Sequence, residues 1–317
     1  MKAVFLDLHS LDCDDLNLAA LEAEFSSFQA YPATASQQVS KRIAGADVVI
    51  INKVVLDRDV LSAATQLKHI CIAATGTNNV DLQAASELGI TVSNCQAYGT
   101  ESVSQHVMAL MLALHTNLIA YNEAARNGRW ARAEQFCLLD YPIQELSGKT
   151  LGIVGYGNLG SAVAQLAGAF GMNVVVAQRA GGDTVGGRLS MEELLPQVDV
   201  LSLHCPLNEH TRDLINADAI EQMKTGAFLI NASRGGIVNE RDLADALRRG
   251  KLAGAATDVL SEEPPVNGNP LLADDIPNLI ITPHCAWGSV QARQRIVDQM
   301  TETLVGLKAG EKIRMVN

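Results

Sequence analysis

Short β-rich runs alternate with helical patterns along the first hundred residues, and this alternation restricts the fold more than any other feature of the sequence. The helical patterns DDLNLAALEAEF (14–25) and VDLQAASELG (80–89) lie between such runs. The β-rich runs themselves are KAVFLD (2–7), ADVVIIN (46–52), HICIAAT (69–75) and ITVSN (90–94). This alternation is typical of βαβ units, which build a parallel sheet covered by helices. We therefore predict an α/β fold.

A second series of strands follows a long helical stretch over residues 100–130. The apolar residues that fall on one face of this helix are Val103, Val107, Leu110, Met111 and Leu114. Gly128 is expected to end the helix. Six further β-rich runs occupy residues 150–155, 173–177, 198–205, 226–233, 252–259 and 278–283. Six strands with helices between them suit a doubly wound parallel sheet.

Composition and charge limit the partners of this chain. It has 317 residues, of which 48% are hydrophobic and 19% charged, as in ordered globular proteins. The formal net charge of −11 argues against nucleic acid or an anionic membrane as the main partner. No run approaches the roughly 18–20 apolar residues of a membrane helix. The opening MKAVFLDLHS lacks the features of a signal peptide, so we expect a cytoplasmic protein.

The cysteines argue against a disulfide framework and against a zinc site. They are scattered along the chain without a C-x-x-C pair, which is typical of reduced thiols. The six positions are Cys13, Cys71, Cys95, Cys137, Cys205 and Cys285. We therefore expect no bound metal.

The segment TLGIVGYGNLGSAVAQLAGAFG contains the pattern Gly155-x-Gly157-x-x-Gly160 between a strand and a helix. In this context the pattern indicates a dinucleotide-binding turn. Gly155 allows the tight turn, Gly157 lets the backbone approach the pyrophosphate, and Gly160 lets the helix pack on the strand. The amides of the helix N-terminus then meet the anion. An ordinary tight turn between a strand and a helix is the weaker alternative.

The strand after this turn ends on VVVAQRA, where NAD-selective sites carry Asp or Glu for the ribose hydroxyls. Here that position is Gln178, followed by Arg179, which is able to pair with a 2′-phosphate. Glycines at 181 and 182 leave the following loop unobstructed. We therefore expect use of NADP with tolerance of NAD. In the alternative, Arg179 points into solvent and Gln178 serves NAD.

Three further strands of the second series are each followed by a chemically active residue. Arg234 follows one strand, Asp258 and the pair Glu262-Glu263 follow the next, and His284 follows the last. Parallel strands place their carboxyl ends at one edge of the sheet, where ligands bind. An arginine binds a carboxylate and a carbonyl oxygen, and a histidine donates a proton near neutral pH. A carboxylate beside that histidine stabilises its protonated form. Together they suit the reduction of a 2-keto acid by a nicotinamide cofactor.

The chain resembles the D-isomer-specific 2-hydroxyacid dehydrogenase family over essentially its whole length. The resemblance rests on LGIVGYGNLG, LHCPLNEHTRDLIN, FLINASRGGIVNE, ATDVLSEEP and TPHCAW, which match in order and spacing. It implies two Rossmann-like domains, with a doubly wound parallel sheet in the cofactor domain and a smaller flavodoxin-like substrate domain. Residues 1–98, completed by 286–317, would form the substrate domain, and residues 99–285 the dinucleotide-binding domain.

The resemblance also assigns roles to single residues. The catalytic triad would be Arg234, Glu263 and His284, with Glu263 preferred to Glu262 because it directly precedes Pro264. A Gln would stand at Glu263 in formate dehydrogenases, which argues against that activity. The implied cofactor contacts are Val103, Gly155, Gly157, Asn158, Leu159, Gly160, Gln178, Arg179, His204, Cys205, Pro206, Thr211, Asn231, Ala232, Ser233 and Asp258. The implied substrate contacts are Thr75, Gly76, Lys53 and Trp287, although Lys53 is equally well explained as a solvated loop lysine.

Within the family, INKVVLD, ATGTNNVD, AYGTESVSQHV and GRW look like the bacterial glycerate dehydrogenases, also called hydroxypyruvate reductases. Phosphoglycerate dehydrogenases commonly have Asn at the position of Gly99 and carry a C-terminal regulatory domain, for which we expect no room here. The expected activity is reduction of hydroxypyruvate or glyoxylate to the D-2-hydroxy acid, and the reverse oxidation of D-glycerate. The family usually forms homodimers through the cofactor domain.

Two alternatives remain open. One is a 2-keto acid reductase of broad specificity, and the choice depends on a pocket that Lys53, Thr75, Trp130 and Trp287 would shape. The other is a non-enzymatic, NAD(H)-sensing protein like the transcriptional corepressors of the family. Those proteins tend to carry long flexible tails, and we expect none in this chain.

Overall fold

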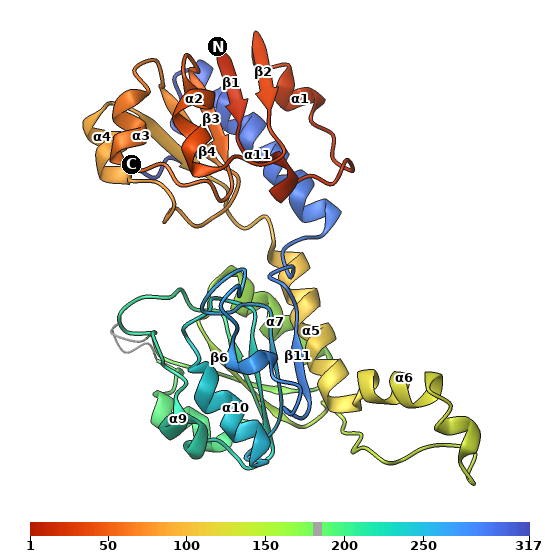
Figure 1. Ribbon diagram of the computed structural model, residues 1–317. Helices are drawn as coiled ribbons and strands as arrows, with labels where there is room; N and C mark the ends of the chain where they lie inside the picture. Colours follow the sequence, from red (N-terminus) through yellow and green to blue (C-terminus); the bar gives the residue numbers. More distant parts are fainter. Residues whose placement is uncertain (180–185) are drawn as a thin grey trace. The chain divides into compact units, whose positions relative to one another are not determined.

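The computed structural model describes residues 1–179 and 186–317, so the glycines at 181 and 182 lie outside the described residues. The chain forms two compact units, each built on a parallel β-sheet (Figure 1). Unit 1 comprises Met1–Gly99 together with Trp287–Asn317, and unit 2 comprises Thr100–Ala286. Two parallel sheets flanked by helices confirm the predicted α/β fold.

Unit 1 contains a five-stranded sheet with the strand order β2-β1-β3-β4-β5. Its strands are β1 (Lys2–Phe5), β2 (Ser27–Ala30), β3 (Val48–Ile51), β4 (His69–Ile72) and β5 (Thr91–Asn94). Its helices are α1 (Ala19–Glu22), α2 (Val39–Ile43), α3 (Arg58–Ala63), α4 (Leu82–Glu87) and α11 (Val290–Lys308). The order is that of flavodoxin-like folds, as predicted.

Helices cover both faces of the unit 1 sheet. On one face, Ile296 of α11 belongs to the same buried cluster as Phe5 and Val48. On the other face, α2, α3 and α4 contribute to a cluster that includes Leu61 and Ile51. Burial on both faces explains why all four residues of β3, VVII, are apolar and buried, without the alternation of a half-exposed strand.

Two elements of unit 1 differ from the prediction. The helical pattern over 14–25 is helical only in α1, because the carboxylate of Asp12 accepts hydrogen bonds from the amides of Asp15 (3.0 Å) and Leu16 (3.2 Å). Such local side-chain bonds compete with the helix. The edge strand β2 was not predicted, because its sequence SFQA is short and only partly apolar.

Unit 2 contains a six-stranded sheet with the order β11-β10-β9-β8-β6-β7. These are the six predicted strands: β6 (Thr150–Val154), β7 (Asn173–Val176), β8 (Val200–Leu203), β9 (Ala227–Asn231), β10 (Leu252–Thr257) and β11 (Leu279–Ile281). Its helices are α5 (Thr100–Thr116), α6 (Leu118–Arg126), α7 (Asn158–Ala169), α8 (Met191–Leu194), α9 (Ala217–Gln222) and α10 (Glu240–Arg248). Strand β6 pairs with β7 on one side and β8 on the other, so the order reverses there. Ligands bind at such a switch point in open α/β sheets.

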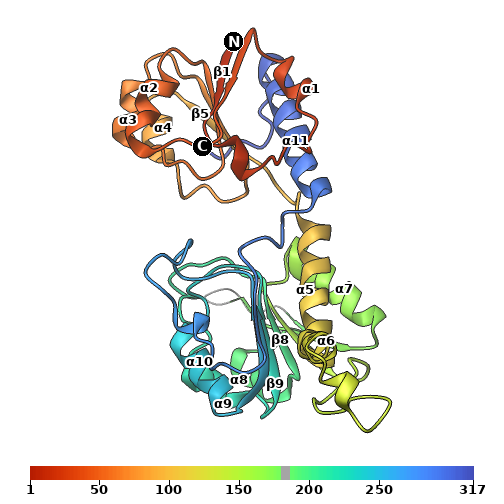
Figure 2. The same ribbon diagram turned by 45° about the vertical axis from the view of Figure 1, so that its right-hand side comes forward.

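The two faces of the unit 2 sheet are covered by different helices. Figure 2 shows α5 and α7 on one face and α8, α9 and α10 on the other. On the second face, Ile220 of α9 and Leu247 of α10 share a buried cluster with Leu201 and Leu229 of the sheet. On the first face, Gly160 and Val163 of α7 and Val107 of α5 are among the buried residues. Because helices cover both faces of the sheet, ligands are expected at the ends of its strands.

The long helix predicted over residues 100–130 is wrong as a single helix. The chain bends by 62° between α5 and α6 at Asn117, which has left-handed angles (φ 50°, ψ 38°). Asn tolerates this conformation better than most residues. Its side-chain amide also donates to the Pro142 carbonyl (2.6 Å), which holds the bend. As predicted, the helical stretch ends at Gly128, which has φ 80°.

Among the described residues, no single helix has the length and apolar character needed to cross a membrane. Helices α5 and α6 reach that length and character only when they are taken together across their bend. Core helices of globular proteins have the same length and apolar character, and α5 buries Val107, Met111 and Leu114 inside unit 2.

Candidate active site

The turn between β6 and α7 is built on close backbone contacts. A Cβ at Gly160 would lie 2.1 Å from the carbonyl oxygen of Gly155, and a Cβ at Gly155 would lie 2.6 Å from the backbone of His204 and Cys205. Gly155 also has φ 94°, a conformation that favours glycine. A Cβ at Gly157, by contrast, would meet no atom of the described residues within 4 Å. Packing of the turn therefore requires glycine at Gly155 and Gly160, whereas the space beside Gly157 is open.

Helix α7 begins at Asn158, with Leu159 in its first turn, directly after the open position of Gly157. The first amides of an α-helix have no acceptor within the helix, and the helix dipole favours an anion there. Open space beside the first amides of a helix fits the pyrophosphate of a dinucleotide.

The segment after β8 lies against this turn at the switch point. The Nε2 atom of His204 and the Ser202 hydroxyl are hydrogen-bonded at 2.8 Å. Burial lowers the pKa of His204 to about 4, so its ring is neutral at neutral pH. Cys205 is buried, and its carbonyl accepts a hydrogen bond from the Ser233 hydroxyl, which ties the segment to the end of β9. Pro206 is exposed beside them.

Other candidate cofactor residues are mostly buried and hydrogen-bonded within unit 2. The Thr211 hydroxyl donates to the Pro206 carbonyl at 2.7 Å, and the Asn231 side chain donates to the Arg234 carbonyl at 3.0 Å. Ala232 and Ser233 follow β9 and are buried. Val103 is buried on α5. These contacts fix the loops at the carboxyl edge of the sheet.

The end of β7 carries two arginines rather than one. Gln178 is half-buried, and its backbone amide donates to the Leu189 carbonyl at 2.7 Å, while Arg179 is exposed. Arg188, which the sequence did not indicate, lies near the same strand end, and its guanidinium is 5.8 Å from the ring centroid of Tyr156 in the glycine turn after β6. The spacing between Gly160 and Arg188 along the sequence did not indicate that Arg188 lies close to Tyr156.

Glu263 and His284 meet at the carboxyl edge, after the neighbouring strands β10 and β11. The Nδ1 atom of His284 lies 2.6 Å from Oε2 of Glu263, and both side chains are about one-third exposed. The other oxygen, Oε1, accepts from the Leu260 amide at 2.8 Å, which fixes the carboxylate. The pairing orients the imidazole through Nδ1, the ring nitrogen that faces the carboxylate.

Arg234 lies in the loop that follows β9. This strand pairs with β10, and the loop after β10 carries Glu263. Its side chain is exposed, and its Nη1 donates to the Ser233 carbonyl at 2.7 Å. The neighbouring Gly235 is required by packing, because a Cβ there would lie 1.9 Å from the Leu260 carbonyl oxygen. The Arg234 loop is thus pressed against the loop that carries Glu263.

Asp258 fixes the loop of His284 through hydrogen bonds that the sequence did not indicate. Its carboxylate is 2% exposed, and it accepts from the Thr282 hydroxyl (2.5 Å) and from the amides of Cys285 and Ala286 (2.9 Å each). The His284 amide donates to the Asp258 carbonyl at 2.8 Å. A residue expected to contact cofactor therefore also fixes the backbone on both sides of His284.

The candidate substrate residues Lys53, Thr75, Gly76 and Trp287 all belong to unit 1. Lys53 and Thr75 follow the neighbouring strands β3 and β4, and the Thr75 hydroxyl donates to the Cys95 carbonyl at 2.8 Å. Asp7, after β1, was missed: its carboxylate accepts from the amides of residues 52, 53 and 54. Trp287 packs edge-on against Tyr98. Trp130 lies instead in unit 2, on a 3-10 turn, and is half exposed.

Comparisons with known proteins agree with this geometry. Residues 108–286 match the family model of the D-isomer specific 2-hydroxyacid dehydrogenase, NAD binding domain. A glycerate dehydrogenase of Methylorubrum extorquens is 41% identical, covering 99% of this chain and 98% of the relative. A hydroxypyruvate reductase of Blautia hydrogenotrophica is 38% identical and covers 100% of both chains. Among solved structures, the TT0316 protein of Thermus thermophilus matches with a TM-score of 0.87 and 34% identity over 100% of both chains.

The two parts of the glycine turn predict different effects of mutation. Gly157→Ala should leave the free energy of unfolding unchanged within about 0.5 kcal/mol, since the methyl group enters open space. It should weaken dinucleotide binding at least about tenfold, because the methyl group obstructs the pyrophosphate. Gly160→Ala should instead destabilise unit 2. Calorimetric titration and denaturant unfolding measure both quantities.

The matched control is Gly168→Ala on the same helix, where a Cβ also meets nothing within 4 Å in the part of the chain that the structure describes. This variant should bind the dinucleotide like the wild type. Equal affinities for the Gly157 and Gly168 variants would contradict the assignment of Gly157 to the pyrophosphate.

Proposed function

Because the chain belongs to the D-isomer specific 2-hydroxyacid dehydrogenase family, we propose that it reduces hydroxypyruvate or glyoxylate to the D-2-hydroxy acid and oxidises D-glycerate in reverse. The observation that carries the proposal is the pair of Glu263 and His284, 2.6 Å apart at the sheet edge that also bears the glycine turn. This pairing supports proton transfer to a substrate held beside a nicotinamide.

In the proposed reaction the nicotinamide cofactor supplies the hydride. His284 donates a proton from Nε2 to the oxygen of the substrate carbonyl, while Glu263 holds Nδ1 and stabilises the imidazolium before the transfer. Arg234 binds the substrate carboxylate with its planar guanidinium and polarises the carbonyl. Gly235 brings this arginine close to the Glu263 loop.

The substrate is proposed from the relatives, whose names give glycerate and hydroxypyruvate. Both are small and carry a carboxylate next to the reacting carbon, as the exposed guanidinium of Arg234 favours. We also propose Lys53 and the backbone around Thr75 and Gly76, all in unit 1, as substrate contacts. A reductase acting on a broad range of 2-keto acids is the second candidate.

We propose that NADP is preferred and NAD tolerated. Two arginines, Arg179 and Arg188, lie near the end of β7, where an NAD-selective site has a carboxylate. Gln178 is uncharged and does not repel a 2′-phosphate, and its amide is able to bind a ribose hydroxyl. An exposed ion pair of this kind contributes about 1 kcal/mol or less, so the preference should be modest.

We also propose a homodimer through the segment 118–143 of unit 2. Figure 1 shows α6 and the loop after it extending away from the sheet of that unit. Large apolar side chains along this segment are 52–89% exposed. They are Leu118, Ile119, Trp130, Phe136, Leu139 and Ile143. Apolar side chains clustered at this exposure are typical of a protein interface.

The proposed activity is tested by following cofactor absorbance with a panel of 2-keto acids. Hydroxypyruvate and glyoxylate should have the highest kcat/KM, and near-equal values for larger 2-keto acids would favour the broad reductase.

His284→Ala should lower kcat by roughly two to four orders of magnitude. Glu263→Gln should lower kcat at least about tenfold and leave KM for the cofactor nearly unchanged, since the imidazole loses the carboxylate that orients it.

His210 provides a control for His284, because it lies 3.4 Å from Glu209 but is exposed on another loop of unit 2. His210→Ala should keep the wild-type kcat. Turnover by His284→Ala near that of the wild type would contradict its role as proton donor.

The cofactor proposal predicts that Arg179→Ala raises KM for NADPH several-fold and leaves KM for NADH nearly unchanged, because only NADPH carries the 2′-phosphate. Gln178→Asp should reverse the preference through repulsion of that phosphate. Arg241→Ala, an exposed arginine on α10, is the control. A wild-type kcat/KM for NADH at least about tenfold above that for NADPH, equivalent to about 1.4 kcal/mol, would overturn the proposal.

The dimer proposal is tested by sedimentation of Leu139→Asp. Leu139 is 78% exposed, so the charge should be tolerated by a monomer but not inside an apolar interface. Val266→Asp places the same charge on another 79% exposed apolar residue of unit 2 and should remain dimeric. A wild-type chain that sediments as a monomer at micromolar concentration would refute the dimer.

A further inference from the structure

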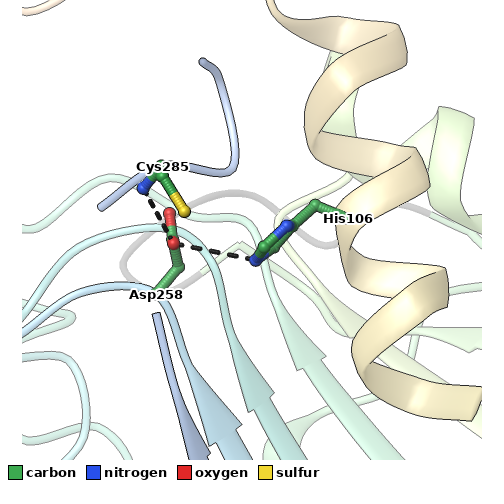
Figure 3. A group of neighbouring side chains, drawn as sticks. All are labelled: His106, Asp258 and Cys285. Atoms are coloured by element: carbon green, nitrogen blue, oxygen red, sulfur yellow. Dashed lines mark hydrogen bonds and ion pairs between the residues drawn. The ribbon is translucent and has the colours of Figure 1, made fainter. Parts of the chain in front are cut away.

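Three side chains of the kinds that bind transition metals meet at the carboxyl edge of unit 2, next to His284. They are His106 on α5, Asp258 after β10 and Cys285 after β11, and their ligand atoms all lie within 4.8 Å of one another. Figure 3 shows the imidazole of His106 and the sulfur of Cys285 directed toward the Asp258 carboxylate. The mechanism proposed above uses neither His106 nor Cys285.

Each member of this cluster is held in place by the fold. The Asp258 carboxylate is fixed by the Thr282 hydroxyl and by two loop amides. The Nε2 atom of His106 lies 3.0 Å from the same hydroxyl and 3.7 Å from Oδ1 of Asp258. Ligand atoms about 2.0–2.1 Å from a tetrahedral zinc ion are roughly 3.3 Å apart, so a shift of a few tenths of an ångström brings this pair to that spacing.

The cluster is also open to solvent on one side. Cys285 is exposed, and the His106 side chain is 22% exposed, whereas Asp258 is buried. An ion arriving from water would meet the sulfur and the imidazole first and the carboxylate below them. One sulfur, one nitrogen and one oxygen ligand suit zinc and leave a fourth position for water.

We propose that His106, Asp258 and Cys285 form a binding site for a thiophilic divalent cation such as Zn²⁺, and that occupation inhibits the enzyme reversibly. The inhibitory part rests on the proposed function. Binding converts the Cys285 thiol to a thiolate and releases its proton to the buffer. The ion replaces the Thr282 hydroxyl as the partner of Asp258 and pulls on Cys285. Both residues fix the loop of His284, so the geometry of proton transfer is lost.

Binding is tested first without any assay of activity, by titrating the full chain with Co²⁺, whose bond to a thiolate absorbs in the near ultraviolet. The wild type should bind one equivalent with this absorption. Cys285→Ser should lose the band, and His106→Gln should bind at least about tenfold more weakly. Cys13→Ser removes the exposed cysteine of unit 1 and should behave as the wild type.

A band that persists in Cys285→Ser would overturn the site. An unchanged affinity in His106→Gln would do the same, because binding would then be that of a surface thiol. Circular dichroism melting shows whether each variant is folded, and Cys285→Ala provides a second variant if the serine is not. The site is supported only if both ligand variants fold and both lose affinity.

Inhibition is tested second, with Zn²⁺ in the reductase assay and reversal by a chelator. Cys285→Ser should require at least about tenfold more Zn²⁺ for half inhibition. Wild-type turnover that resists Zn²⁺ at concentrations saturating the Co²⁺-defined site would refute the inhibitory role. A chain that binds Co²⁺ as expected but reduces no 2-keto acid would instead refute the proposed function, so the two failures are distinguishable.

Discussion

The buried carboxylate of Asp258 is the interaction on which the carboxyl edge of the unit 2 sheet depends. It joins the ends of β10 and β11 by accepting hydrogen bonds from Thr282, Cys285 and Ala286. Hydrogen bonds to a charged group contribute roughly 1.5–3 kcal/mol each. The backbone around His284 is consequently fixed on both sides, although His284 itself has φ 51° and lies in a loop. Without this anchor, the imidazole would not be held at the distance from Glu263 that the proposed proton transfer requires.

A second constraint is the close approach of loops at the same edge. Gly160 allows α7 to pack against Gly155, and Gly235 allows the Arg234 loop to press against Leu260. In both places a Cβ would lie about 2 Å from a backbone oxygen, which no side chain tolerates. The glycine turn after β6 and the loop of Arg234 are therefore positioned by backbone contacts.

The same edge explains why one cluster of residues supports two proposals. Asp258 orients the His284 loop in the proposed reduction, and it is the buried ligand of the proposed cation site. An ion bound there would compete with Thr282 for the carboxylate. Catalysis and inhibition would thus be linked through a single group, without any change in the rest of the fold.

The sequence by itself determined the α/β class, the six strands of unit 2 and the glycine turn after β6, because glycine spacing and apolar runs report backbone geometry directly. It also indicated Arg234, Glu263 and His284, since residues that follow parallel strands share one edge. Only the tertiary structure decided the bend at Asn117, the short α1 and the approach of Arg188 to Tyr156. It alone brought His106, Asp258 and Cys285 together, because these residues come from three separate elements and no spacing along the chain records their contact.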